Sequence, residues 1–205
     1  MIAVLDYGSG NVRAFLNAYE RMKIACRAAR GPADLEGAER IILPGVGAFD
    51  TALKQFEDSG MMQPVRERVL ESGVPLLGVC VGMQMLADRS EEGSRTGLGW
   101  IPGAVRKLRA PSPNASLRLP HMGWNQIEIQ PDAPLLSRLP SGGRFYFLHS
   151  YAFECADSRH AIARSNYGVE FTCAVRRKNV WAVQFHPEKS HDDGMTVLKN
   201  FATLI

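Results

Sequence analysis

Short apolar runs alternate with longer amphipathic stretches from the N-terminus to Arg89. Such runs, bounded by turn residues, are typical of buried strands, and they predict strands over residues 2–6, 24–29, 40–43 and 74–79. Residues 11–22 place Val12, Phe15, Leu16 and Tyr19 at helical spacing, and helices are also predicted over 49–56 and 61–70. Strands that alternate with helices indicate a parallel sheet joined by crossover helices.

After Arg89 the pattern changes to short β-rich segments separated by Gly and Pro. The predicted strands in this part cover residues 104–108, 126–129, 145–153, 161–165, 169–175 and 181–185. We expect them to extend the sheet in antiparallel or mixed fashion. A helix over 196–204 ends the chain, and the Pro-containing segment 110–115 is predicted to be an exposed loop. The expected fold is α/β: one domain over residues 1–205, with a mostly parallel central sheet flanked by helices and an antiparallel β-rich extension.

Composition narrows the class of protein. A chain of 205 residues with 45% hydrophobic content can bury a substantial core. The net charge of +3 is too small to indicate a nucleic-acid partner. The four cysteines form no CxxC pair, which favours a reducing compartment. The chain opens directly into a strand, and no apolar run approaches the roughly 18 residues that span a bilayer. We therefore expect a soluble cytoplasmic protein without a membrane partner.

The chemistry is concentrated around Cys80. It is the centre of the sequence Gly-Val-Cys-Val-Gly at 78–82, between a predicted strand and a helix-like segment. This arrangement is typical of a nucleophile elbow, where flanking glycines avoid backbone collisions. The helix N-terminus favours the thiolate, and the Val81 amide points where an oxyanion would form. A buried structural thiol is the alternative, which the paired glycines disfavour.

His186 and Glu188 directly follow the predicted strand 181–185. Because parallel strands end at the same edge of a sheet, His186 can reach Cys80 as a general base. Glu188 would orient the imidazole and stabilise its charged form. The Pro-Gly-Val-Gly segment at 44–47 is either an ordinary turn or a loop whose peptide can reorient to form an adjustable oxyanion hole.

The Cys80 segment and the His-Pro-Glu at 186–188 resemble the class I glutamine amidotransferases. Segments spanning nearly the whole chain look like those of the glutaminase subunits of imidazole glycerol phosphate synthase: 6–11, 43–49, 89–93, 121–125, 146–151 and 186–190. The chain departs from the expected pattern at Val81, where leucine is more usual, and at His191, where glutamine is common. The resemblance implies that a Cys80–His186–Glu188 triad hydrolyses glutamine to glutamate and ammonia through a γ-glutamyl thioester.

The same resemblance implies further roles. The amides of Val46 and Val81 would form the oxyanion hole. Four residues would hold the glutamine: Gly47, Gln84, Ser150 and Tyr151. Ammonia would pass to a (β/α)₈ barrel, the cyclase subunit that makes imidazole glycerol phosphate and AICAR in histidine biosynthesis. The resemblance implies neither a cofactor nor a metal.

Three alternative functions differ in the sequence segments, partners or residues that each would need. Glutaminase subunits of anthranilate or aminodeoxychorismate synthase would lack the Met-Gly-Trp-Asn segment at 122–125. A cysteine hydrolase or peptidase of similar architecture would act without a partner and accept larger amides. A scaffolding subunit with a vestigial site would not need Cys80.

Overall fold

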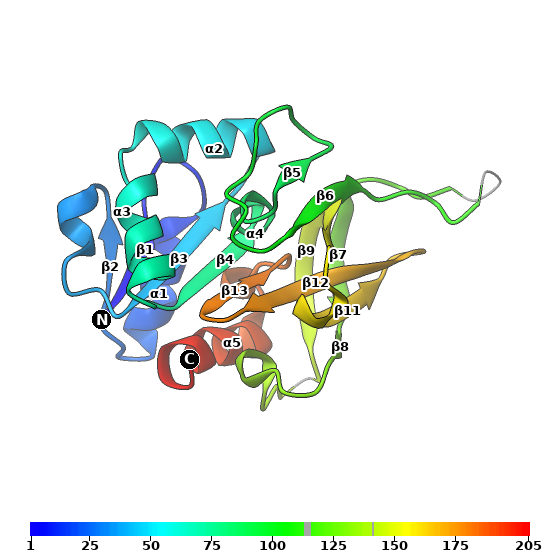
Figure 1. The fold of residues 1–205 in the computed structure, drawn as a ribbon. Helices are drawn as coiled ribbons and strands as arrows, with labels where there is room; N and C mark the ends of the chain where they lie inside the picture. Colours follow the sequence, from blue (N-terminus) through cyan, green and yellow to red (C-terminus); the bar gives the residue numbers. More distant parts are fainter. Residues whose placement is uncertain (113–115, 141) are drawn as a thin grey trace.

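A large mixed sheet forms the centre of the computed structural model, which describes residues 1–112, 116–140 and 142–205 (Figure 1). Five strands run parallel in the order β2-β1-β3-β4-β13. Their bounds are Ile2–Leu5 (β1), Cys26–Ala29 (β2), Arg40–Gly45 (β3), Leu76–Cys80 (β4) and Val180–Val183 (β13). All four residues of β1 and all five of β4 are buried, as expected of central parallel strands.

Helices cover this part of the sheet. They are α1 (Val12–Arg21), α2 (Phe49–Asp58), α3 (Met62–Arg66), α4 (Val81–Met85) and α5 (His191–Thr203), with a π-helical turn, Glu67–Glu71, after α3. The helix α1 buries Phe15, Ala18 and Tyr19 along one stripe, and the Tyr19 hydroxyl donates to the Leu198 carbonyl of α5 at 3.1 Å. In Figure 1, α1 and α5 lie below the sheet, while α2 lies above it and contacts α4.

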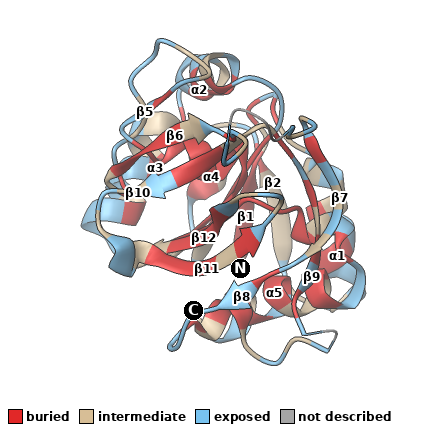
Figure 2. Cartoon of the chain, turned by 90° about the vertical axis from the view of Figure 1, so that its right-hand side faces the viewer, coloured by how far each residue is buried: buried red, intermediate tan, exposed pale blue. Residues whose placement is uncertain are grey.

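The second half of the chain continues the sheet with antiparallel strands. These are β6 (Gly103–Lys107), β10 (Tyr151–Cys155), β11 (Ala161–Asn166) and β12 (Glu170–Arg177), with short β5 (Arg89–Ser90) and β8 (Glu128–Ile129) at the edges. A separate two-stranded sheet pairs β7 (His121–Gln126) with β9 (Arg144–His149). Short 3₁₀ turns cover Pro32–Leu35, Pro134–Leu136, Ser158–His160 and Pro187–Lys189. Buried residues line both the central strands and the inward faces of the helices (Figure 2). The predicted α/β class with its antiparallel extension is confirmed.

Two predicted strands are wrong in their extent. The segment 145–153 is two strands, β9 and β10, which lie in different sheets. The break falls at Ser150, whose carbonyl accepts from the Leu108 amide and begins the pairing of β10 with β6. The segment 126–129 contains only the end of β7, which starts at His121, and the separate β8. An unbroken apolar run does not reveal where a chain changes partner strands.

Other predicted boundaries also differ. The last helix begins at His191 rather than at 196. Its first turn contains Gly194, where a Cβ would lie 1.9 Å from the Pro187 carbonyl oxygen, so this turn packs tightly on the preceding segment. The strand β13 ends at Val183 rather than at 185, and β3 includes Pro44 and Gly45. Within the predicted loop 110–115, Pro111 and Ser112 are exposed, and 113–115 lie outside the described residues. Within the described part of the chain, no helix has the length and apolar composition that a membrane crossing requires.

Candidate functional site

Cys80 ends β4 and begins α4 in a strained backbone conformation. Its φ of 56° and ψ of −112° are costly for a residue with a side chain. The flanking glycines explain how the turn packs, since a Cβ on Gly82 would lie 2.0 Å from the Leu43 carbonyl oxygen and one on Gly78 would lie 2.9 Å from the Gly82 oxygen. The chain therefore has the sharp strand-to-helix turn that the glycine spacing predicts.

His186 and Glu188 lie just beyond the neighbouring strand. Parallel pairing sets Val183 of β13 opposite Val79 of β4, so the two strands end beside each other. The His186 Nδ1 atom is 2.8 Å from Glu188 Oε1, and their side chains are only 4% and 2% exposed. The His186 amide donates to the Tyr146 carbonyl at 2.9 Å, which anchors this turn to β9. With Nδ1 held by the carboxylate, the other ring nitrogen is left for Cys80.

The environment of His186 favours its charged form. Burial by itself would lower the pKa of this histidine, but hydrogen bonds with Cys80 and Glu188, together with their negative charges, raise the pKa to about 10. An imidazolium that persists at neutral pH stabilises a thiolate beside it. The arrangement can therefore present a charged nucleophile and, after the proton moves, a general acid.

We expect Glu188→Gln to lower the pKa of His186 by at least about one pH unit, because the opposite charge that holds its proton is lost. NMR titration of the His186 ring measures this directly. Glutaminase activity should fall about tenfold or more, since the charged ring is no longer stabilised. Glu170→Gln, which changes an exposed carboxylate paired with Arg164, is the matched control.

The same variant tests the linkage to stability. A pKa raised on folding from 6.5 to about 10 contributes stability that is complete below pH 6.5 and is lost as the pH rises toward 10. The difference in free energy of unfolding between wild type and Glu188→Gln should therefore narrow between pH 6 and pH 10. A difference that stays constant over this range would mean that Glu188 does not act through the charge of His186.

A cavity of about 290 Å³ opens at this end of the sheet. Eight residues singled out from the sequence line it: Val46, Gly47, Cys80, Val81, Gln84, Ser150, Tyr151 and His186. Glu188 is not in the lining and lies behind His186. Sequence reasoning missed two further charged side chains of the lining, Glu92 and Lys189. Both belong to segments that carried the resemblance, 89–93 and 186–190, which was the available signal.

His149 also lines the cavity but is unsuited to be a base. Burial lowers its pKa to about 3, although a hydrogen bond to the Tyr151 carbonyl opposes this, and the charges of His121 and His186 lower it further. Its Nε2 atom is 3.0 Å from His121 Nδ1, and burial lowers the pKa of His121 to about 4. Two neutral rings joined in this way leave His186 as the histidine that can exchange a proton with Cys80.

The Val46 amide is held away from the oxyanion role expected of it. It donates to the Ser9 hydroxyl at 2.9 Å, and the same hydroxyl lies 3.0 Å from the Val46 carbonyl. The Tyr7 hydroxyl donates to the Pro44 carbonyl at 2.5 Å, and burial above all raises the pKa of Tyr7. Gly47 has a φ of +85°, with open space where a Cβ would be. Hydrogen bonds with Ser9 therefore restrain the loop next to a glycine in a left-handed conformation.

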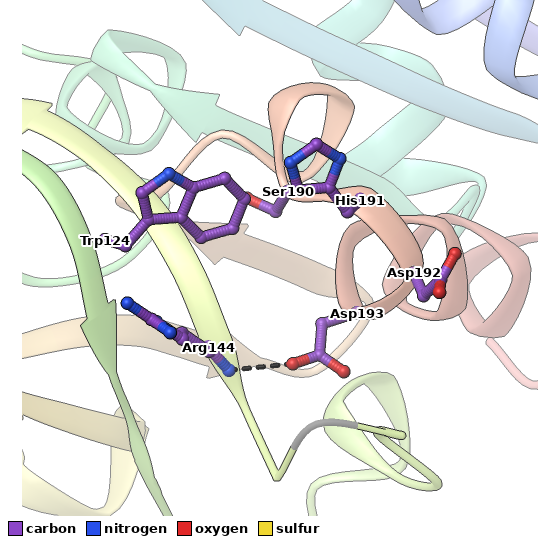
Figure 3. A pocket seen from close by; sticks show the side chains of 6 residues that line it. All are labelled: Trp124, Arg144, Ser190, His191, Asp192 and Asp193. Carbon is purple, nitrogen blue, oxygen red and sulfur yellow. Dashed lines mark hydrogen bonds between the residues drawn. The ribbon is translucent and has the colours of Figure 1, made fainter.

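A second cavity, of about 340 Å³, lies beside Trp124 and the start of α5 (Figure 3). The Trp124 and His191 rings stack at 4.9 Å with an interplanar angle of 1°. The Arg144 backbone amide donates to Asp193 at 2.8 Å. The Ser190 hydroxyl is already engaged with the His186 carbonyl and the Tyr146 amide. The lining of this second cavity contains neither Cys80 nor His186, both of which line the first one. Among the described residues, no group of three or more His, Cys, Asp or Glu side chains is placed to hold a metal ion.

Comparisons with known proteins show the family and the fold of the chain. The family model "Glutamine amidotransferase class-I" matches residues 3–204. The chain is 50% identical to imidazole glycerol phosphate synthase subunit HisH of Bdellovibrio bacteriovorus and 46% identical to the subunit of that name from Leptospira borgpetersenii, with 100% of each chain covered. A crystal structure of a glutamine amidotransferase superposes with a TM-score of 0.72 at 25% identity, covering 98% of both chains.

Proposed function

Because this chain belongs to the class-I glutamine amidotransferases and, within them, to the HisH subunits of imidazole glycerol phosphate synthase, we propose that it hydrolyses L-glutamine to supply ammonia for histidine biosynthesis. The observation that carries the proposal is the strained, buried Cys80 beside a charged His186 that is held by Glu188. Residues 1–205 act as one glutaminase domain in the cytoplasm, and the activity uses neither a cofactor nor a metal.

The reaction has two halves that share one base. The Cys80 thiolate attacks the side-chain amide carbon of glutamine, and the tetrahedral oxyanion accepts hydrogen bonds from the Val81 and Val46 amides. The His186 imidazolium gives its proton to the leaving nitrogen, so ammonia departs and a γ-glutamyl thioester remains. His186 then removes a proton from water, which attacks the thioester, releases glutamate and regenerates Cys80.

Glutamine fits the charge pattern of the cavity. We propose that the glutamine substrate is held by four residues, Gly47, Gln84, Ser150 and Tyr151. The acidic Glu92 and the basic Lys189 of the lining are proposed to contribute as well. A free amino acid carries both an ammonium and a carboxylate, and one acidic and one basic side chain can pair with them. Glu92 already accepts from the Phe49 amide at 2.9 Å, which fixes its carboxylate at the start of α2.

The cyclase barrel is proposed to dock around the mouth of this cavity. Met122 and Leu148 lie opposite each other on β7 and β9, and both are exposed, at 65% and 38%. Trp124 and Val46 add further apolar surface, and Val46 and Leu148 line the cavity itself. A (β/α)₈ subunit covering this surface in a heterodimer would receive ammonia directly from the site, for the lyase step that makes imidazole glycerol phosphate and AICAR.

Docking is proposed to release the Val46 amide. We expect Ser9→Ala to raise the glutaminase rate of the isolated subunit about three- to tenfold, because one hydrogen bond that holds the resting loop is removed. The rate with the liganded barrel should change little. Glutamate release measures both rates, and Ser59→Ala, which removes a hydroxyl bonded to the Phe56 carbonyl, is the control. A basal rate that is unchanged would show that Ser9 does not restrain the loop.

Glutamate release from L-glutamine tests the function itself. The subunit is assayed alone, with the cognate barrel, and with the barrel bound to its nucleotide substrate. A low rate alone that rises sharply with the liganded barrel supports the proposal. A full rate without the barrel would instead indicate an autonomous hydrolase, and no rate in any of the three conditions would contradict glutamine hydrolysis.

A further inference from the structure

Gln184 is a buried amide that sequence reasoning did not single out. It lies one residue beyond β13 and two before His186, and its exposed fraction is 0%. Its backbone amide donates to the Cys173 carbonyl at 2.8 Å, which fixes the start of the side chain. A buried amide needs hydrogen-bond partners, and both side-chain partners of Gln184 belong to the site described above.

The side chain of Gln184 connects the nucleophile to the substrate cavity. Its Nε2 atom donates to Cys80 Sγ at 3.8 Å, and its Oε1 atom accepts from Gln84 Nε2 at 3.1 Å. Gln84 Nε2 also donates to the Tyr151 carbonyl at 3.1 Å. Because Gln84 thereby uses both hydrogens of its amide, its carbonyl oxygen is the atom that it can offer to a ligand.

We propose that Gln184 is a positioning residue that stabilises the Cys80 thiolate and orients Gln84 toward the substrate. This inference rests on the proposed glutaminase function and extends it to a residue outside the triad. Gln184 does not itself line the cavity, and its side chain bonds to two residues that do, Cys80 and Gln84, so it acts through them.

The chemistry of the two sulfur contacts supports this role. An N–H donor such as Gln184 Nε2 favours the thiolate, which can only accept a hydrogen bond. The Leu148 carbonyl, 3.9 Å from the same sulfur, can accept a hydrogen bond from the protonated thiol but not from the thiolate. The two neighbours therefore favour opposite protonation states of Cys80, and removal of the donor tips the balance toward the thiol. The other titratable groups around this sulfur or its cavity are Tyr7, Glu92, His149, His186, Glu188 and Lys189.

The test uses the rate at which iodoacetamide alkylates Cys80 as a function of pH. Peptide mass spectrometry separates Cys80 from the other three cysteines. Gln184→Met keeps a similar volume but has no donor, and Gln184→Glu adds a negative charge beside the sulfur. We expect the pH midpoint of alkylation to rise by about one pH unit in Gln184→Met, the effect of one charge-assisted hydrogen bond. The midpoint should rise further in Gln184→Glu, with the limiting rate at high pH within about twofold of wild type.

Asn200→Leu is the matched control for a purely structural role. Asn200 is another buried amide, and it donates to the Leu135 and Ser137 carbonyls of a different part of the fold. Its loss should lower thermal stability without moving the alkylation midpoint. A midpoint that is unchanged in a folded Gln184 variant would overturn the proposal. Gln184→Met is neutral and Gln184→Glu is charged. If one of these two variants folds poorly, the other still gives an alkylation midpoint.

Glutamine turnover with the liganded barrel separates this inference from the proposed function. We expect Gln184→Met to lower kcat and raise KM, because both the thiolate and Gln84 lose a restraint, with a fall in kcat/KM of about tenfold. Wild-type turnover with an unchanged midpoint in the variants would overturn only the role of Gln184. A wild type that does not turn over glutamine would contradict the proposed function instead.

Discussion

Glutamine turnover should fall by about a thousandfold or more when Cys80 is replaced by alanine, because the reaction loses the atom to which the glutamyl group is transferred. Cys80→Ser should lose nearly as much, since a hydroxyl is far less ionised than a thiol beside the same His186. The measurement is glutamate release with the liganded barrel, which gives the largest wild-type rate against which a loss can be read.

The control for this prediction is Cys155→Ala. Cys155 is half-buried outside the cavity, and burial is the main cause that raises the pKa of its thiol to about 12. Its removal should leave turnover within about twofold of wild type, as expected of a thiol that stays protonated. The Cys80→Ala variant should still bind the barrel. Wild-type turnover in that variant would contradict the thioester route.

Gly82→Ala is expected to destabilise the fold by about 3 kcal/mol or more, because the new methyl group would collide with the backbone of β3. A Cβ at this position would lie 2.0 Å from the Leu43 oxygen and 3.2 Å from the Pro44 carbonyl carbon. Both atoms belong to β3, whose pairing with β4 leaves them no room to withdraw. Urea unfolding of wild type and variant measures the loss.

Gly31→Ala is the matched control for that substitution. Gly31 has an extended φ of −156°, and nothing lies within 4 Å of an added Cβ. Its free energy of unfolding should change by less than about 0.5 kcal/mol. A similarly small loss in Gly82→Ala would mean that β3 can move away from the elbow. The close contact between the oxyanion loop and the nucleophile would then be adjustable rather than imposed by packing.

The pattern of apolar residues was sufficient to predict elements whose buried face follows a regular spacing along the chain. The stripe of α1 and the buried run of β4 follow from the spacing of apolar residues, and both lie within two residues of their predicted bounds. The pattern gave wrong bounds at Ser150, where one apolar run contains two strands of different sheets. It also missed the first turn of α5, where Gly194 packs closely on Pro187. Each failure occurs where packing against another strand or turn sets the boundary.

The sequence by itself determined the chemical identities and the local strain of the site. Glycines that flank Cys80 specify a sharp turn, and His186 and Glu188 are close enough along the chain to bond to each other. Only the tertiary structure decided which partners those groups meet. Ser9 reaches Val46 across 37 residues, and Gln184 reaches Cys80 across 104. Contacts of this kind depend on the order and register of the parallel strands, which are set by packing between elements and not by the residues on either side of each group.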